Sequence, residues 1–251
     1  MSSIALITGG NRGLGRATAL ALATAGVDVI ITYRTNATEA AELVDEVKGL
    51  GRVAVALRLD TREVETFDAF ADALRSTLHD TWNRDTFDHL VNNAGVGLAG
   101  MVADTTVEVF DELFGVHVRG VFFLTQKLLP LIADNGRIVN FSTGLARFVN
   151  NGPWAAYGAA KGAVEVFTRY LAQEVAPRGI TANVIAPGPI GTGFGGGALQ
   201  NEQVSEHLGG LTAMGRIGRP EEIGGLVATL LTGNTGWVTA QRIEASGGML
   251  L

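Results

Sequence analysis

The stretch TGGNRGLG, residues 8–15, decides the fold class of this chain. It joins an apolar run at 3–8 (SIALIT) to an Ala/Leu-rich run at 14–25, which are the patterns of a strand and of a helix. The spacing T-G-x3-G-x-G is carried by Gly9, Gly13 and Gly15. Glycines at these places permit a tight turn and let backbone N–H groups approach a pyrophosphate at the helix N-terminus. Many α/β proteins need such a turn for structural reasons alone, so the motif indicates dinucleotide binding only together with further signals.

The same alternation of strand and helix continues along the whole chain. Strands are expected at 3–8, 27–32, 53–58, 87–92, 137–142, 180–186 and 241–245. Helices are expected at 14–25, 37–49, 63–78, 106–133, 154–175 and 220–231. Several strands are apolar nearly throughout, as strands covered on both faces must be, and no linker or internal repeat interrupts the series. The pattern predicts an α/β fold built from βαβ units.

Composition argues against several classes of function. The net charge is -6 and no Lys/Arg cluster occurs, so nothing would follow the phosphates of a nucleic acid. The chain has no cysteine, and therefore neither disulfides nor thiolate metal ligands. The start MSSIALITGG has no basic region and too few apolar residues for a signal peptide or a membrane span. We expect a soluble, cytoplasmic protein with no metal, nucleic-acid or membrane partner.

The residues after the second expected strand favour NADP(H) over NAD(H). An acidic residue there would bind the ribose 2′-hydroxyl of NAD, whereas a basic residue accommodates the 2′-phosphate of NADP. This chain continues with YRTN (33–36), which contains no acid, and Arg12 lies inside the glycine turn. Arg12 and Arg34 together indicate NADP(H), unless Arg34 is an ordinary solvent-facing side chain.

The segment AYGAAKGAV, residues 156–164, places Tyr157 and Lys161 four residues apart and so on one face of a helix. A tyrosine ionises near pH 10 in water, and an adjacent ammonium group favours its ionised form, so Tyr157 could act as a general acid or base. The strand at 137–142 leads into Thr143, whose hydroxyl could hold a substrate carbonyl. Taken alone, Y-x3-K also describes an ordinary amphipathic helix.

Taken together, the motifs resemble the short-chain dehydrogenase/reductase family in order and spacing, over essentially the whole chain. They are TGGNRGLG, Asp60 after the third strand, NNAG (92–95), RIVNFST, YGAAK, IAPGPIGT, MGRIGRPEEI (214–223) and the terminal SGGM. The resemblance implies one dinucleotide-binding and catalytic domain over residues 1–251, with a Rossmann-like doubly wound fold and a seven-stranded parallel sheet covered by helices on both faces. It also implies hydride transfer to or from a nicotinamide, and commonly a homotetramer. Within the family, the chain looks most similar to 3-oxoacyl-[acyl-carrier-protein] reductases and carbonyl reductases.

The resemblance further implies which residues would bind the cofactor. The three glycines of the turn would hold the pyrophosphate, Asp60 with Thr61 would meet the adenine, and Asn92 with Ala94 would line the adenosine-ribose side. Residues 187–192 would surround the nicotinamide amide. The full expected set is Gly9, Asn11, Arg12, Gly13, Leu14, Gly15, Tyr33, Arg34, Asp60, Thr61, Asn92, Ala94, Gly95, Tyr157, Lys161, Pro187, Gly188, Ile190 and Thr192.

For catalysis, the resemblance implies that Tyr157 donates a proton to the substrate oxygen. Lys161 would bind the nicotinamide ribose and lower the pKa of the tyrosine. The serine of the family falls on Thr143, with Ser142 as a second candidate. Threonine retains the hydroxyl but adds a methyl group and a stiffer χ1, so the pocket could differ in shape.

One position departs from the family pattern. The segment GVHVRGVFF, residues 115–123, has His117 where the family has the asparagine of its catalytic tetrad, which helps to hold a water next to the lysine. His117 could replace that asparagine and make the relay sensitive to pH near 6.5, or it could be a structural histidine that needs only a hydrogen bond. Loss of activity and a metal site are further alternatives, although no second ligand stands at a supporting spacing.

A glycine-rich segment lies near the end of the chain. Six of the ten residues from 188 to 197 are glycine, and polar residues follow, so we expect a mobile substrate lid at about 188–215. Phe148, Trp154 and Phe194 would make the substrate pocket largely apolar, or would serve only as packing. Arg147 could meet an anionic substrate or face solvent.

The sequence therefore predicts NADPH-dependent reduction of a ketone or aldehyde, with a carrier-linked 3-oxoacyl chain and a free small-molecule carbonyl both possible. Two alternatives stay open: an NAD-linked alcohol or sugar dehydrogenase, and a cofactor-binding sensor or scaffold whose turnover is impaired by His117. Gly158 and Gly162, with the phenylalanines at 122 and 123, suit helix packing between subunits, so a homotetramer or dimer is expected.

Overall fold

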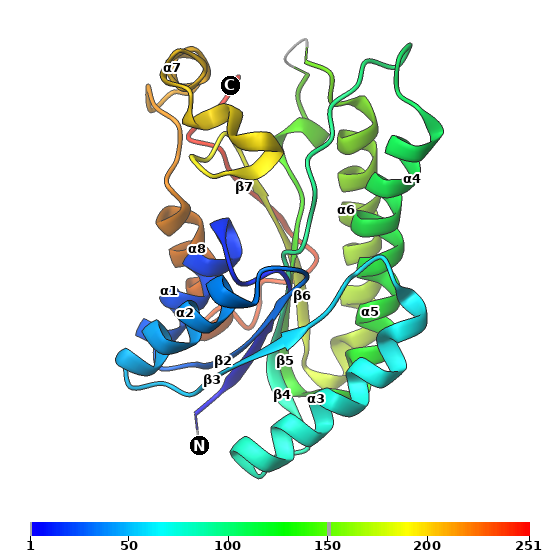
Figure 1. Cartoon of the computed structure of the whole chain (residues 1–251), viewed down its shortest axis with the longest axis vertical. Helices are drawn as coiled ribbons and strands as arrows, with labels where there is room; N and C mark the ends of the chain where they lie inside the picture. The colour runs from blue at the N-terminus through cyan, green and yellow to red at the C-terminus, as the bar shows by residue number, and fades with distance from the viewer. Residues whose placement is uncertain (1, 150–151) are drawn as a thin grey trace.

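The computed structural model of the protein describes residues 2–149 and 152–251. Seven parallel strands form one sheet in the order β3-β2-β1-β4-β5-β6-β7, with helices on both of its faces (Figure 1). From β1 the chain builds outward through β2 and β3, and then crosses back to place β4 on the other side of β1. This reversal creates the switch point at which open α/β sheets bind their ligands. The Rossmann-like doubly wound fold is confirmed.

All seven predicted strands are present. Their bounds are β1 Ile4–Ile7, β2 Asp28–Tyr33, β3 Ala54–Arg58, β4 Phe87–Asn92, β5 Ile132–Phe141, β6 Thr181–Pro187 and β7 Arg242–Ala245. The central strands are buried on both faces, which explains why their sequences are apolar without alternation. Only β5 begins clearly earlier than predicted, at Ile132, and its pairing with β4 shifts in register between Phe87 and His89.

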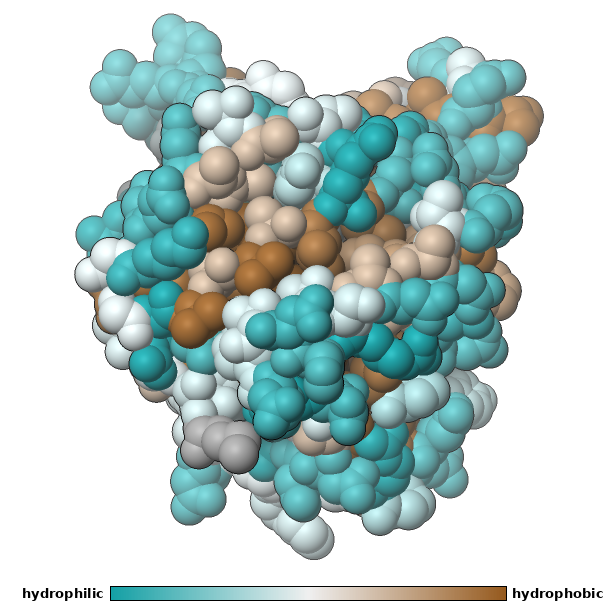
Figure 2. Space-filling model, turned by 60° about the horizontal axis from the view of Figure 1, so that its bottom comes forward, coloured by the Kyte–Doolittle hydropathy of each residue, from teal (hydrophilic) through white to brown (hydrophobic). Residues whose placement is uncertain are grey.

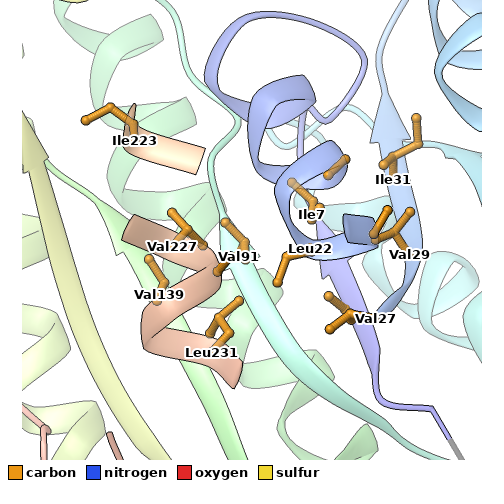
Figure 3. Packing of buried hydrophobic residues seen from close by; sticks show 14 of the residues in the cluster. Ile7, Leu22, Val27, Val29, Ile31, Val91, Val139, Ile223, Val227 and Leu231 are labelled. Carbon is orange, nitrogen blue, oxygen red and sulfur yellow. The ribbon is translucent and has the colours of Figure 1, made fainter. Parts of the chain in front are cut away.

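The helices divide into two layers. The layer on one face is α1 Gly13–Thr24, α2 Ala37–Gly49 and α8 Pro220–Thr232; the other is α3 Phe67–Trp82, α4 Val107–Phe114, α5 Val121–Leu128 and α6 Ala155–Val175. Each layer has its own apolar core against the sheet. Figure 3 shows Leu22 of α1 and Val227 of α8 directed at Val91 of β4. Short 3-10 turns lie at Val64–Thr66, Leu129–Leu131, Gly144–Ala146 and Ala176–Arg178, and an irregular, kinked segment lies at Phe194–Gln200.

Not every hydrophobic residue lies in these two cores. On the face drawn in Figure 2, hydrophobic residues gather in the middle and hydrophilic residues surround them. Phe122 of α5 and Tyr170 of α6 are also exposed, to 43% and 72%. Among the described helices, none combines the length and the apolar composition that crossing a membrane would require.

The helix predicted over 106–133 is wrong in two respects: it is not α-helical throughout, and residues 132–133 already belong to strand β5. Between α4 and α5 the chain forms a π-helical segment, Gly115–Gly120, which contains His117. A π-helical turn inserts a residue into the helix and rotates the side chains that follow, and such turns are frequent at functional sites. The interruption therefore falls on the position where the sequence departs from the family pattern.

The segment predicted as a lid contains a helix that sequence reasoning missed, α7 Glu202–Gly210. The side chain of Asn201 caps it by accepting a hydrogen bond from the Val204 backbone N–H at 3.2 Å. Before it, Gly195, Gly196 and Gly197 all have left-handed backbone angles, with φ of 61°, 79° and 76°. Figure 1 places α7 above the carboxyl ends of the strands, beside the C-terminus.

Candidate active site

A cavity of about 900 Å³ opens at the carboxyl ends of the strands, where β1 and β4 adjoin. The glycine turn after β1 forms one wall, and α6, the segment after β5 and the segment 187–195 form the others. The volume lies within the range of sites for drug-sized ligands and cofactors.

The glycine turn has the geometry of an anion cradle. Gly9 and Gly13 have positive φ, 61° and 55°, which side chains rarely tolerate. Arg12 takes the N-cap position of α1 without capping it by a side-chain hydrogen bond. The first turn of α1 therefore offers backbone N–H groups and the positive end of the helix dipole to an anion.

Gly15 does not line the cavity, contrary to its predicted contact with the pyrophosphate. A Cβ atom at this position would lie 2.3 Å from the carbonyl oxygen of Gly9 and 2.6 Å from Nδ2 of Asn93. Only a glycine allows the helix to approach the turn this closely, so Gly15 has a packing role behind the glycine turn and does not contact the cavity.

Arg12 and Arg34 both line the same end of the cavity, together with Tyr33 and Asn36. Within residues 2–149 and 152–251, neither arginine has a carboxylate within salt-bridge distance. Two arginines without acidic partners can neutralise a phosphate group.

Asp60 also lines this end, and Arg62 holds it through Nε at 3.0 Å. The Arg62 hydrogen bonds lower the pKa of the Asp60 carboxyl below its usual value, although partial burial opposes them. A carboxylate held in this way accepts hydrogen bonds at a fixed place, as recognition of an adenine amino group would require. The neighbouring Thr61 also lines the cavity.

At the other end, Tyr157, Lys161 and Thr143 lie together in the cavity wall, all nearly buried. Lys161 Nζ donates a hydrogen bond to the carbonyl oxygen of Phe141 at 2.8 Å, and lies 5.9 Å from the centre of the Tyr157 ring. Tyr157 and Lys161 come from one face of α6, whereas Thr143 comes from the end of β5, so two elements meet at one point.

Burial governs the ionisation of these groups. It raises the pKa of Tyr157 above its usual value, and a hydrogen bond with Thr143 opposes that shift. Burial also lowers the pKa of Lys161 to about 7. Tyr157 is therefore neutral at physiological pH and holds a proton that it can donate. The lowering of the tyrosine pKa that the family resemblance implied is not found in this environment.

The hydroxyl of Ser142 forms its hydrogen bond with Glu165, not with Tyr157 or Lys161 Nζ. It donates a hydrogen bond to Glu165 Oε1 at 2.6 Å, and that carboxylate also accepts one from Arg242 Nε at 2.7 Å. The Thr143 hydroxyl, in contrast, accepts a hydrogen bond from the Leu145 backbone N–H at 3.3 Å and lies close enough to Tyr157 to oppose the rise of the tyrosine pKa. Of the two hydroxyls proposed from the sequence, the geometry favours Thr143.

His117 is fully buried in the cavity wall. Its Nε2 lies 2.8 Å from the carbonyl oxygen of Val96, and its ring meets the Tyr157 ring edge-on, with centroids 5.3 Å apart. Burial, and then the nearby Lys161, lower the pKa of His117 well below its usual value. The imidazole is therefore neutral, and the expected pH sensitivity near 6.5 is corrected.

The neutral ring has a definite orientation. Nε2 lies 2.8 Å from the Val96 carbonyl oxygen and 3.4 Å from the Val96 backbone nitrogen, and the shorter contact favours a proton on Nε2, which leaves a lone pair on Nδ1. Among the described residues Nδ1 has no hydrogen-bond partner, although it is buried. Gly95 makes room for the ring, since a Cβ atom there would lie 2.7 Å from Cε1 of His117.

The structure also corrects the expectation for Asn92. Its side chain is buried behind the cavity, where Nδ2 donates to Thr125 Oγ1 at 2.9 Å and to Asn140 Oδ1 at 2.8 Å. The next residue, Asn93, lines the cavity instead and donates to the carbonyl oxygens of Thr8 and Gly9. Successive residues leaving a strand point to opposite faces, which explains the exchange.

The remaining predicted residues line the cavity: Asn11, Leu14, Ala94, Gly95, Phe148, Trp154, Pro187, Gly188, Ile190, Thr192 and Phe194. Sequence reasoning missed the contribution of α7, which supplies Gln203, Val204, His207 and Leu208, and that of Met249 near the C-terminus. The helix cap Asn201, with Val204 and Leu208 four residues apart, was a signal that could have identified α7.

Comparisons with known proteins agree with this geometry. A family model described as enoyl-(acyl carrier protein) reductase matches residues 9–250. A 3-oxoacyl-[acyl-carrier-protein] reductase of Synechocystis sp. is 34% identical, over 100% of this chain and 98% of its own length. The hydroxynaphthalene reductase-like protein Arp2 of Metarhizium brunneum is 33% identical over 98% of this chain and 94% of its own. The crystal structure of the angucycline C-6 ketoreductase LanV with bound NADP has a TM-score of 0.93 and 34% identity, and covers 99% of this chain and 95% of that one.

Proposed function

The chain belongs to the short-chain dehydrogenase/reductase family of oxidoreductases, and from this membership and the geometry of its cavity we propose that it reduces a ketone or aldehyde with NADPH. One observation carries the proposal. A single cavity joins an anion cradle with two arginines at one end to Tyr157 and Thr143 at the other. A dinucleotide that lay along it would bring its nicotinamide to the two hydroxyls.

The residues present fit NADP(H). The left-handed glycines of the turn leave room for a pyrophosphate, and Arg12 with Arg34 supply charge for a 2′-phosphate. The NADP bound in the related LanV structure also supports this choice. When bound, NADPH would supply the hydride for the carbonyl carbon.

The chain's own residues would complete the reduction. Thr143 would hold the carbonyl oxygen, and neutral Tyr157 would donate its phenolic proton to that oxygen as the carbon is reduced. Carbonyl, hydride and proton together give the alcohol and leave a tyrosinate, which must be reprotonated. Lys161 lies 5.9 Å from the Tyr157 ring centre, where its ammonium form would stabilise that tyrosinate. It would also bind the nicotinamide ribose.

His117 would act as a positioning residue in this scheme. It holds the loop after β4 through Val96 and supports the Tyr157 ring, while its Nδ1 lone pair offers a place for a relay water. The retention of Tyr157, Lys161 and Thr143 in one wall argues against the sensor or scaffold alternative.

Two further features belong to the proposal. The segment 188–215 would act as a lid, because its three left-handed glycines join α7 to the cavity wall.

A homotetramer or dimer would bury exposed apolar residues of α5 and α6, among them Phe123 and Val166.

Turnover with a panel of carbonyl compounds, NADPH and NADH tests the proposal. We expect NADPH oxidation with an alcohol as product, and a loss of kcat of about 10²- to 10⁴-fold in Tyr157→Phe. A Tyr157→Phe variant as active as the parent protein would refute the mechanism. Cofactor binding without turnover of any carbonyl would favour the sensor or scaffold.

Cofactor choice is tested separately by Arg34→Ala. The preference for NADPH over NADH should fall at least about tenfold, because a charge-assisted contact to phosphate contributes roughly 1.5–3 kcal/mol. Arg16→Ala is the matched control, since Arg16 lies on α1 outside this cavity and is paired with Glu46. A parent protein that prefers NADH would instead support the NAD-linked dehydrogenase.

A further inference from the structure

We propose that the substrate is a free, uncharged and flat aromatic ketone with polar groups at the end remote from its carbonyl, rather than a carrier- or CoA-linked acyl chain. The inference rests on the proposed carbonyl reduction and adds the class of substrate. Three observations support it: the aromatic walls around Tyr157, the polar face of α7, and the distribution of charge along the cavity.

Aromatic rings surround the proposed proton donor. The ring centroids of Trp154 and Phe194 each lie 5.9 Å from that of Tyr157, with interplanar angles of 68° and 51°. His117 adds a third ring at 5.3 Å. Rings prefer such tilted or edge-on neighbours at centroid distances of about 4.5–7 Å. A flat aromatic ketone that reaches Tyr157 would therefore meet ring faces and edges, whereas an aliphatic chain would gain only contact area.

The rings of Phe194 and Phe148 pack directly against the backbone of glycine residues. A Cβ atom at Gly97 would lie 2.6 Å from Cε1 of Phe194, and one at Gly144 would lie 2.5 Å from Cζ of Phe148. Both distances are shorter than real Cβ contacts, so any other residue would displace the ring. The close approach of large rings to this end of the cavity thus depends on these two glycines.

The outer part of the cavity has a different character. Gln203 and His207 stand four residues apart on α7 and line the cavity together with Leu208. Neither polar side chain makes a hydrogen bond to another group within the described residues. Both can bind hydroxyl or carbonyl groups at the remote end of a ring system.

Charge along the cavity disfavours anionic thioesters. The Lys and Arg residues of its lining are Arg12 and Arg34 at the cradle and the buried Lys161. Arg147, a candidate for binding an anionic substrate, is instead held by Glu244 through two hydrogen bonds of 2.6 and 2.7 Å. Glu202 and Glu206 of α7 are exposed beside the cavity mouth, and neither forms an ion pair in the described part of the chain. Among the described lining residues, the phosphate groups of phosphopantetheine or CoA would find no lysine or arginine outside the cofactor end except the buried Lys161.

The test compares three substrates with the holoenzyme and saturating NADPH: 2-tetralone, the uncharged thioester acetoacetyl-N-acetylcysteamine, and acetoacetyl-CoA. We expect kcat/KM for 2-tetralone to exceed that for either thioester at least tenfold. An equal or higher value for either thioester would overturn the proposal and leave carbonyl reduction itself intact.

A pair of tryptophan variants tests the aromatic wall. Trp154→Ala should raise KM for 2-tetralone about tenfold, because stacking and apolar contact are lost. Trp237→Ala is the matched control, since Trp237 is fully exposed and lies outside the cavity lining. Equal KM values in the two variants would contradict the inference.

Binding separates failure of this inference from failure of the proposed function. If no carbonyl compound is reduced, titration of the NADP⁺ complex with 2-tetralone still shows whether the cavity binds an aromatic ketone. Saturable binding that Trp154→Ala weakens would support the aromatic site, whereas absence of binding would overturn it.

Discussion

Burial of the Lys161 ammonium group has a measurable consequence for the stability of the protein. The pKa of this group is about 7 in the folded chain because of burial, against the ordinary value of 10.5. Between these values the unfolded chain binds more protons than the folded one, so the free energy of unfolding must rise with pH.

We therefore predict that the cofactor-free protein gains about 3 kcal/mol of stability from pH 7 to pH 9.5 at this site, by linkage. Below pH 7 both states hold the proton and the cost of the buried charge is fully present. Above pH 10 the raised pKa of Tyr157 acts in the opposite direction. Urea denaturation across this pH range measures the gain in stability. The gain should disappear in Lys161→Met and persist in Lys48→Met, which changes an exposed lysine. A slope that persists in Lys161→Met would exclude the assignment.

His117 provides the second prediction at the residue scale. His117→Ala removes the contact with Val96 and the support of the Tyr157 ring, and should lower the free energy of unfolding by about 2–4 kcal/mol. We expect kcat to fall as well, by about tenfold, because a misplaced proton donor reacts more slowly.

His117→Asn separates ionisation from positioning. Because the pKa of His117 lies well below 6.5, this variant should keep the shape of the rate profile between pH 6 and 9. A step near pH 6.5 in the parent protein that the asparagine variant lacks would show that the histidine titrates in the active enzyme.

At the scale of elements, helices α1 and α8 pack closely against each other at Gly224. A Cβ atom at Gly224 would lie 2.5 Å from the carbonyl oxygen of Ala17, whereas one at Gly225 would meet nothing within 4 Å. The two glycines are neighbours on α8 but face the partner helix and solvent respectively.

These positions form a matched pair of variants. Gly224→Ala should destabilise the protein by roughly 1–3 kcal/mol, because the helices must separate against a packed core. Gly225→Ala should stabilise it by about 0.5–1 kcal/mol, through helix propensity alone. Thermal unfolding of both variants measures the difference, and shifts of the same sign would contradict the packing argument.

At the scale of the whole molecule, exposed apolar side chains gather on α5 and α6. Phe122 and Phe123 are 43% and 39% exposed, and Tyr170 is 72% exposed. Burying such a surface against a second copy of the chain would remove apolar area from water.

We expect light scattering to show a homo-oligomer and Phe123→Asp to reduce its mass, because a buried carboxylate without a partner opposes association. Leu50→Asp is the control, since Leu50 is 49% exposed at the end of α2. A monomeric parent protein, or an unchanged mass in Phe123→Asp, would disprove an interface at this surface.

The sequence alone predicted the order of strands and helices, the glycine turn, and the pairing of Tyr157 with Lys161. These features follow from local signals: apolar runs, glycine spacing and the helical repeat, which neighbouring residues along the chain determine. The coverage of the sheet by helices on both faces could also be expected, because the strands are apolar without alternation.

The tertiary structure decided the rest. It turned Asn92 inward and Asn93 toward the cavity, engaged Ser142 with Glu165, and buried His117 so that its pKa falls. It also formed the π-helical segment at Gly115–Gly120 and brought α7 to the substrate end. Each of these depends on partners far apart in the sequence, because burial and hydrogen bonding are set by which elements meet in space.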